Sequence, residues 1–229
     1  MRPAVVTFAE EIVRALPIKD PVVEIGARRV EGETHPDAIR RLFADCEYIG
    51  CDLEAGLGVD RVEDVHELSF ADESVGTILC LDTLEHVADP LRAVKEMYRV
   101  LKPDGVVALS SVMFFPIHAY PWDYWRFTPE GFEKLLEPFA TRLVLHQGYE
   151  YLPETVLGVG LKGSERKLVP DLFPETNRVA RRWGEHLRVD LGPIRMSLRA
   201  LWRLTLAETW KAVPRKARAR ARGGRPSPS

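Results

Sequence analysis

Acidic residues recur at corresponding places in the first part of the chain, each at or next to the end of an expected strand. Glu24 lies one residue before the end of the first run and is followed by Gly26, while Asp52 and Asp64 close later ones. Carboxyl ends of parallel strands meet at one edge of a sheet, where ligands of α/β proteins bind. Any one acid would be interpreted as a loop cap or a solvated residue. Three at the same structural place favour a nucleoside-type ligand, whose amino, ribose and adenine groups donate hydrogen bonds to carboxylates.

The elements that must position these acids follow from the hydrophobic pattern. Strands and helices alternate, and the strands are nearly continuous apolar runs, which predicts a doubly wound, mostly parallel α/β sheet covered on both faces. An N-terminal helix ending at Pro17 is expected to cover the edge or mouth of the sheet. The expected strands are about 21–26, 48–52, 61–64, 75–81, 106–111, 141–147 and 154–162. The other expected helices are about 36–44, 90–101 and 129–136.

Composition bounds the class of protein. The chain has 229 residues and a formal net charge of -2, which gives no overall attraction to nucleic acid or membrane. Three cysteines without metal-ligand spacing indicate reduced cytosolic thiols, and no metal site is evident. No apolar run is long enough to span a bilayer, and Glu10 and Glu11 interrupt the stretch where an export signal would be apolar. We therefore expect a cytoplasmic protein.

The pattern changes after residue 163. We expect four parts: an N-terminal helix within 1–19, the main domain over 20–163, a helical extension over 164–213 with helices at about 175–188 and 194–212, and a basic disordered tail over 214–229. The last of these helices packs either on the domain or a second subunit, giving a homo-oligomer, or on anionic lipid, giving a membrane-peripheral protein. Nucleic-acid binding by the tail would be nonspecific.

Several motifs occur together in a fixed order along the main domain. The chain resembles the class I S-adenosylmethionine-dependent methyltransferases, and within them the type 11 group, over roughly 20–163. The motifs that carry the resemblance are Tyr48-Ile49-Gly50-Cys51-Asp52, Gly58-Val59-Asp60, 64–74 (DVHELSFADES), Leu81-Asp82-Thr83-Leu84-Glu85-His86-Val87-Ala88-Asp89-Pro90 and 99–105 (RVLKPDG). The resemblance implies a Rossmann-like, seven-stranded sheet whose last strand is reversed, with S-adenosylmethionine as cofactor.

The resemblance also implies roles for individual residues. Glu24 would hold the methionine amino group through the first loop, and Gly26 would let the cofactor approach. Asp52 would accept the ribose hydroxyls, whereas Asp64 and Val65 would meet the adenine. The other residues of the implied cofactor site are Leu81 and Asp82 against the methionine part, with Ala27, Arg28 and Leu53 in the adjoining loops.

Two positions depart from the usual family pattern. The first loop reads Gly26-Ala27-Arg28-Arg29 where two or three glycines are usual, and Val75-Gly76 replaces the usual Phe-Asp. The first motif instead resembles that of a subgroup of the family reading E-I-G-(S/A)-R. Alanine keeps such a turn only at negative φ.

A second block, residues 118–131 (HAYPWDYWRFTPEG), also resembles that subgroup. Its aromatic residues could form an acceptor-binding lid in which His118, Asp123 or Tyr124 takes a proton. In the alternative, Arg126 pairs with a carboxylate and Thr128 caps the next helix; for 125–128 this structural alternative is preferred. His118 is the best candidate for a base, because histidine changes charge near neutral pH. His86 is assigned to the start of a helix, and His66 either stacks near the adenine or is exposed.

The leading hypothesis is a methyltransferase acting on a small-molecule or carbohydrate-like acceptor by in-line displacement. The alternative is a catalytically inactive methyltransferase fold that serves as a scaffold or partner-binding module. The glycine-poor first loop suggests this alternative. Acids at all three strand ends argue against the scaffold. A nicotinamide-dependent dehydrogenase is a weaker hypothesis, because the Gly-rich turn is missing.

Overall fold

The computed structural model describes residues 2–29, 38–119, 121–177, 179–180, 188–191 and 194–197. The chain divides into two units, residues 1–179 and 180–229, and the first contains the sheet and all the described helices. The helices are α1 (Pro3–Ala15), α2 (Ala38–Leu42), α3 (Pro90–Val100) and α4 (Pro129–Leu135), with short 3-10 helices η1 (Leu84–His86) and η2 (Pro170–Leu172).

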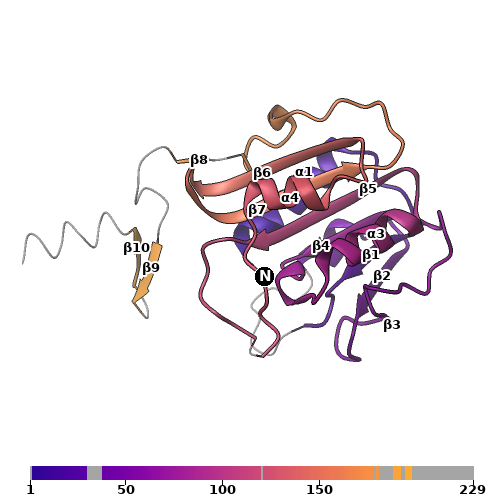
Figure 1. Ribbon diagram of the computed structural model, residues 1–229, viewed down its shortest axis with the longest axis horizontal. Coiled ribbons are helices and arrows are strands. Elements are labelled where there is room, and N and C mark those ends of the chain that lie inside the picture. Colours follow the sequence, from indigo (N-terminus) through magenta and orange to yellow (C-terminus); the bar gives the residue numbers. More distant parts are fainter. Residues whose placement is uncertain are drawn as a thin grey trace, which may run out of the picture. The chain divides into compact units, whose positions relative to one another are not determined.

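A mixed sheet forms the centre of the first unit (Figure 1). Its strands are β1 (Val22–Ile25), β2 (Tyr48–Asp52), β3 (Arg61–Val62), β4 (Val75–Leu81), β5 (Leu101–Val112), β6 (Thr141–Tyr149) and β7 (Leu152–Leu161), and they lie in the order β3-β2-β1-β4-β5-β7-β6. A two-residue strand, β8 (Val179–Ala180), follows at the β6 edge. The first five strands are parallel, and β7 is antiparallel to both β5 and β6. The predicted doubly wound sheet with a reversed last strand is confirmed.

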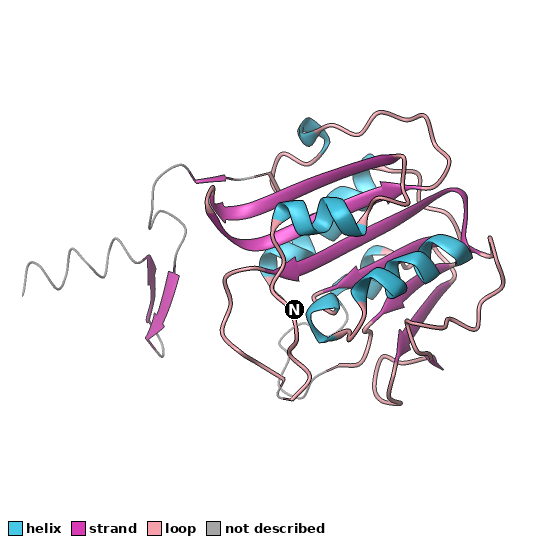
Figure 2. Ribbon diagram, viewed as in Figure 1, coloured by secondary structure: helices cyan, strands magenta, loops and turns pink. Residues whose placement is uncertain are grey.

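Helices cover both faces of this sheet (Figure 2). On one face, Met97 of α3 and Phe132 of α4 are fully buried with Ile78 of β4. On the other face, Phe8 and Ile12 of α1 are fully buried in a cluster that also contains residues of α2, β4, β5 and β7. The helix α1, expected at the edge or mouth, thus packs on a face of the sheet. Alternate strand residues point to opposite faces, so the nearly continuous apolar strands predicted from the sequence serve both cores.

Local sequence signals explain where α3 and α4 begin. Pro90 and Pro129 stand at the first positions of α3 and α4, where a missing N–H costs nothing. The Asp89 side chain accepts a hydrogen bond from the Arg92 N–H, and the Thr128 hydroxyl accepts one from the Gly131 N–H. The predicted cap at Thr128 is confirmed.

The C-terminal helices expected from the sequence do not match the described residues. Residues 174–176 form a turn, and β9 (Arg188–Leu191) pairs with β10 (Ile194–Ser197) as an antiparallel hairpin. The sequences RVDL and IRMS alternate polar and apolar residues, which is the period of a strand and not of a helix. The rest of the predicted helices and the basic tail over 214–229 lie outside the described residues.

The segment before this hairpin packs on α1. Phe173 is fully buried against Phe8, and Glu11 accepts hydrogen bonds from the N–H groups of Glu175 and Thr176 at 2.9 Å each. The division of the chain at residue 163 remains a prediction. None of the helices in the described ranges combines the length and the apolar character that crossing a membrane would need.

Candidate functional site

The register of the sheet aligns the ends of its central strands. Ile25 at the end of β1 pairs with Cys51 of β2 on one side and Cys80 of β4 on the other, and Leu81 pairs with Ser110 of β5. The residues that follow these positions therefore begin their loops at one edge of the sheet. Parallel α/β sheets bind ligands at this edge, and the predicted cofactor residues belong to it.

Gly26 makes the turn out of β1. Its φ is +83°, a left-handed conformation that favours glycine, and a Cβ placed on it would lie 2.1 Å from Oγ1 of Thr83. The N–H groups of Gly26 and Ala27 both donate to the Cys51 carbonyl, at 2.8 and 3.0 Å. Gly26 thus stands where conformation and space both require a glycine, and Ala27 does not have a positive φ.

Asp52 anchors the rest of the first loop. Its Oδ2 accepts a hydrogen bond from the Arg28 N–H at 3.1 Å, and its Oδ1 accepts one from the Glu54 N–H at 3.2 Å. The Arg28 guanidinium pairs with Glu54 at 2.7 Å and passes close to Gly56. A carboxylate has about four acceptor sites. Asp52 therefore keeps the capacity to accept further donors at this edge, while Leu53 beside it is largely exposed.

Glu24 of β1 is buried. Its Oε2 accepts a hydrogen bond from the Tyr48 hydroxyl at 2.5 Å. Burial, and then the negative charge of Glu24, raise the pKa of Tyr48 far above its ordinary value, so this phenol remains a donor. The hydrogen bond ties the Glu24 carboxylate to the neighbouring strand β2.

Asp64 belongs to a chain of hydrogen bonds beyond β3. Its Oδ1 accepts from the N–H of His66 at 2.9 Å and lies 2.7 Å from Nδ1 of the same residue, while His66 Nε2 accepts from the Asp89 N–H. This pattern requires the proton on Nδ1. The hydrogen bond from the His66 backbone is the main cause that lowers the pKa of Asp64. The Asp64 carboxylate is about half exposed, and Val65 beside it is buried.

Asp82, directly after β4, has a partner that the sequence did not suggest. The Nε and Nη2 atoms of Arg2 donate to its two oxygens at 2.7 and 2.5 Å, and Arg2 also donates to the Thr155 hydroxyl of β7. Ser110 donates to Asp82 as well, and Asp82 itself has a positive φ of 49°. Arg2 is eighty residues away in the chain, so only the packing of α1 on the sheet brings the two together.

The aromatic block after β5 is held by an ion pair. Both oxygens of Asp123 accept from Arg126, at 2.6 and 2.7 Å, and the His118 N–H donates to Oδ2. These hydrogen bonds, the Arg126 contact above all, hold the pKa of Asp123 well below its usual range. The geometry thus argues against Asp123 as a proton acceptor at neutral pH and favours the structural alternative for Asp123 and Arg126. Tyr124 is nearly half exposed, with its backbone N–H bonded to the Glu85 carbonyl.

Comparison with known proteins relates part of the chain to a family. Residues 32–109 match the methyltransferase domain family Methyltransf_11. A Thermotoga maritima structure described as an S-adenosylmethionine-dependent methyltransferase, possibly for histamine N-methylation, aligns with a TM-score of 0.51 at 22% identity, covering 68% of this chain and 89% of that one. Residues 32–109 thus carry a methyltransferase domain of this family, and the fold around them is that of the class I S-adenosylmethionine-dependent methyltransferases. S-adenosylmethionine is the methyl donor of this family.

Curated relatives of this chain are named for quinone biosynthesis. The ubiquinone/menaquinone biosynthesis C-methyltransferase UbiE of Geotalea daltonii is 26% identical over 138 residues, which are 59% of this chain and 48% of the relative. The ubiquinone biosynthesis O-methyltransferase of Parvibaculum lavamentivorans is 27% identical over 96 residues, which are 42% of this chain and 36% of the relative. The chain thus spans less than half of the length of either relative.

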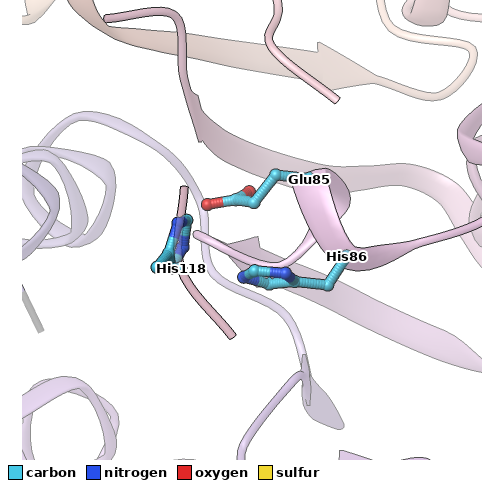
Figure 3. A group of neighbouring side chains, drawn as sticks. All are labelled: Glu85, His86 and His118. Atoms are coloured by element: carbon cyan, nitrogen blue, oxygen red, sulfur yellow. The ribbon is translucent and has the colours of Figure 1, made fainter. Parts of the chain in front are cut away.

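The structure also brings together residues that lie apart in the sequence. Glu85 and His86 of η1 meet His118 of the aromatic block (Figure 3). Burial, and then the charge of Asp82, raise the pKa of Glu85. The motif Leu84-Glu85-His86-Val87 contains two of these three residues. From the sequence alone, His86 was assigned to the start of a helix, and Glu85 was given no role.

Proposed function

We propose that this chain binds S-adenosylmethionine at the carboxyl edge of its sheet and transfers the methyl group to a small-molecule acceptor. The observation that carries the proposal is the placement of Asp52 and Asp64 along this edge. Each uses part of its hydrogen-bonding capacity to order its own loop and retains capacity for another donor. The residues present therefore fit the cofactor that the family uses.

Each residue of the edge has a definite task in this proposal. Asp52 accepts the ribose hydroxyls, and Asp64, with buried Val65 beside it, meets the adenine amine and ring. Leu81 and Asp82 lie along the methionine part, and Glu24 holds the loop next to its amino group. The bound donor supplies a methyl group already activated on a sulfonium. The protein's task is to align donor and acceptor, which supplies on the order of 7–11 kcal/mol of the barrier.

The loop after β5 suggests the kind of acceptor. It exposes a run of large apolar side chains: Phe114, Phe115, Ile117, Trp122, Tyr124 and Trp125. Such a concentration of exposed aromatic residues is typical of a surface that binds a ligand. We propose an acceptor with a ring that stacks on these side chains, either an aromatic ring, as in the quinone pathways that name the relatives, or the apolar face of a sugar.

A base is needed only if the acceptor is a weakly acidic hydroxyl. His118 is then the candidate, because Nδ1 lies 3.2 Å from the Pro116 carbonyl and the opposite nitrogen can take a proton. Tyr124 is the second group of this loop that can exchange one. The bidentate contact of Asp123 with Arg126 argues against this role for Asp123.

Calorimetric titration with S-adenosylhomocysteine tests the cofactor part of the proposal. We expect micromolar binding by the wild type and a loss of at least tenfold in Asp52→Asn, which keeps the size of the side chain. The matched control is Glu67→Gln, because Glu67 is an exposed carboxylate in the loop after β3. Failure of the folded wild type to bind would refute the proposal and favour the inactive scaffold. Screening of acceptors with labelled donor then tests transfer.

A further inference from the structure

We propose that Glu85, His86 and His118 form a binding site for a divalent transition-metal ion. One ligand atom from each residue lies within 4.8 Å of the others, and Figure 3 shows the three side chains gathered at one point. Two of them come from η1 after β4, and the third comes from the loop after β5. The proposal concerns metal binding alone and goes beyond methyl transfer.

The Glu85 carboxylate supplies the strongest evidence. The residue is 1% exposed, and its Oε2 accepts a hydrogen bond from the Ser111 hydroxyl at 2.6 Å. Its Oε1 is buried and has no hydrogen-bond partner among the described residues. A buried carboxylate oxygen without a partner is costly, because water that would solvate it has been removed. A metal ion bound at Oε1 would replace that lost solvation.

The two neighbouring acids support this argument, because each forms an ion pair with an arginine. Asp82 is paired with Arg2, and Asp123 is paired with Arg126. Within the described ranges, no lysine or arginine forms an ion pair with Glu85. Among the described residues, the Glu85 carboxylate is therefore the one of these three acids that forms no ion pair, and a divalent cation would supply its counterion.

Both histidines are oriented as metal ligands commonly are. Nδ1 of His86 lies 3.0 Å from the Trp122 carbonyl, and Nδ1 of His118 lies 3.2 Å from the Pro116 carbonyl. A carbonyl oxygen only accepts, so each Nδ1 carries the proton and each Nε2 keeps its lone pair. A backbone carbonyl that orients the second nitrogen is typical of histidine ligands to metals. The described part of the chain gives neither Nε2 a hydrogen-bond partner.

The donor set selects the class of ion. Two imidazoles and one carboxylate suit zinc, iron, cobalt or manganese, whereas magnesium and calcium prefer oxygen ligands. Ligands about 2.1 Å from a tetrahedral zinc ion lie ~3.4 Å apart, so the group must contract by up to ~1.4 Å when it binds. His118 lies on a loop, and a small shift of that loop closes the site. Three protein ligands leave a position for an oxygen atom of a bound molecule.

Equilibrium dialysis of the untagged full-length chain against Zn²⁺ tests the proposal, with metal content measured by mass spectrometry and Co²⁺ replacing zinc for visible spectroscopy. The test variants are Glu85→Gln, which keeps the shape of a buried residue, and His118→Ala, which changes a loop residue and leaves the core intact. The matched control is His146→Gln, because His146 is a histidine of β6 outside the group. Thermal unfolding checks that each variant is folded.

We expect one Zn²⁺ per chain, retained in excess Mg²⁺ and by the His146→Gln variant, with affinity at least tenfold lower in Glu85→Gln and in His118→Ala. The Co²⁺ complex should show visible absorption that both test variants lose. A folded wild type that binds no Zn²⁺, variants that bind as tightly as the wild type, or displacement of zinc by Mg²⁺ would each overturn the proposal. Binding of S-adenosylhomocysteine is measured separately, so the metal site and the proposed function can fail independently.

Discussion

The replacement of Gly26 by alanine probes the turn at the head of the candidate cofactor site. Two separate effects act at this position. The backbone has a φ of +83°, which an alanine adopts only with strain. The added Cβ would also lie 2.1 Å from Oγ1 and 2.7 Å from Cγ2 of Thr83, so either the loop or Thr83 must move.

The expected loss of unfolding free energy combines both effects. Left-handed backbone costs alanine about 1–2 kcal/mol, of which about 0.4–1 kcal/mol is offset because alanine reduces the entropy of the unfolded chain. Overpacking against Thr83 adds about 1–3 kcal/mol. We therefore expect Gly26→Ala to destabilise the protein by about 2–4 kcal/mol. Gly163, with a φ of +66° and nothing within 4 Å of a Cβ, isolates the backbone effect, and Gly163→Ala should cost about 1 kcal/mol or less.

Urea denaturation followed by circular dichroism measures these differences, and a double-mutant cycle with Thr83→Ala separates them. Thr83→Ala removes both clashing atoms and, by itself, the hydrogen bond from Oγ1 to the Leu81 carbonyl, at about 1 kcal/mol. In the double variant, Gly26→Ala should cost about 1–3 kcal/mol less than it does alone. Equal losses for Gly26→Ala and Gly163→Ala, with no coupling to Thr83, would show that the contact with Thr83 does not constrain the turn.

Three further predictions concern stability and reactivity. Removing the cap of α3 with Asp89→Ala should cost about 1 kcal/mol in thermal or urea unfolding, and an unchanged stability would contradict the capping role. Because Arg126 lowers the pKa of Asp123, this pair stabilises the fold fully above the unfolded pKa of about 3.9, and the contribution declines below that pH until it is lost as pH falls through the lowered pKa of the folded state. Asp123→Asn should therefore lower the melting temperature at pH 7 by an amount that shrinks steadily as pH falls below about 4; a gap as large at pH 3 as at pH 7 would refute this. Thiol titration should label one cysteine, Cys46, in the native protein and all three in denaturant, because the other two are fully buried.

Much of the fold could be predicted because its determinants are local. Apolar runs of strand length mark β1, β4 and β5, and prolines after capping residues mark the starts of α3 and α4. The shared location of the acids at strand ends could be predicted for the same reason, because parallel strands place their carboxyl ends at one edge of a sheet. The C-terminal helices were predicted wrongly where residues are described, because arginine-rich stretches suggested helix while RVDL and IRMS alternate with the period of a strand.

The sequence by itself determined the family, the sheet and the set of acids along its carboxyl edge, because apolar periodicity and motif order are properties of neighbouring residues. Only the tertiary structure decided how these acids are used. It paired Asp82 with Arg2 from the start of the chain. It also gathered Glu85, His86 and His118 from two loops. Such contacts depend on side-chain directions and on the packing of α1 and the β5–α4 loop, which no local pattern specifies. Acids that look alike in sequence therefore differ in the fold, where burial and the nearest arginine distinguish a structural ion pair from a carboxylate that forms no ion pair among the described residues.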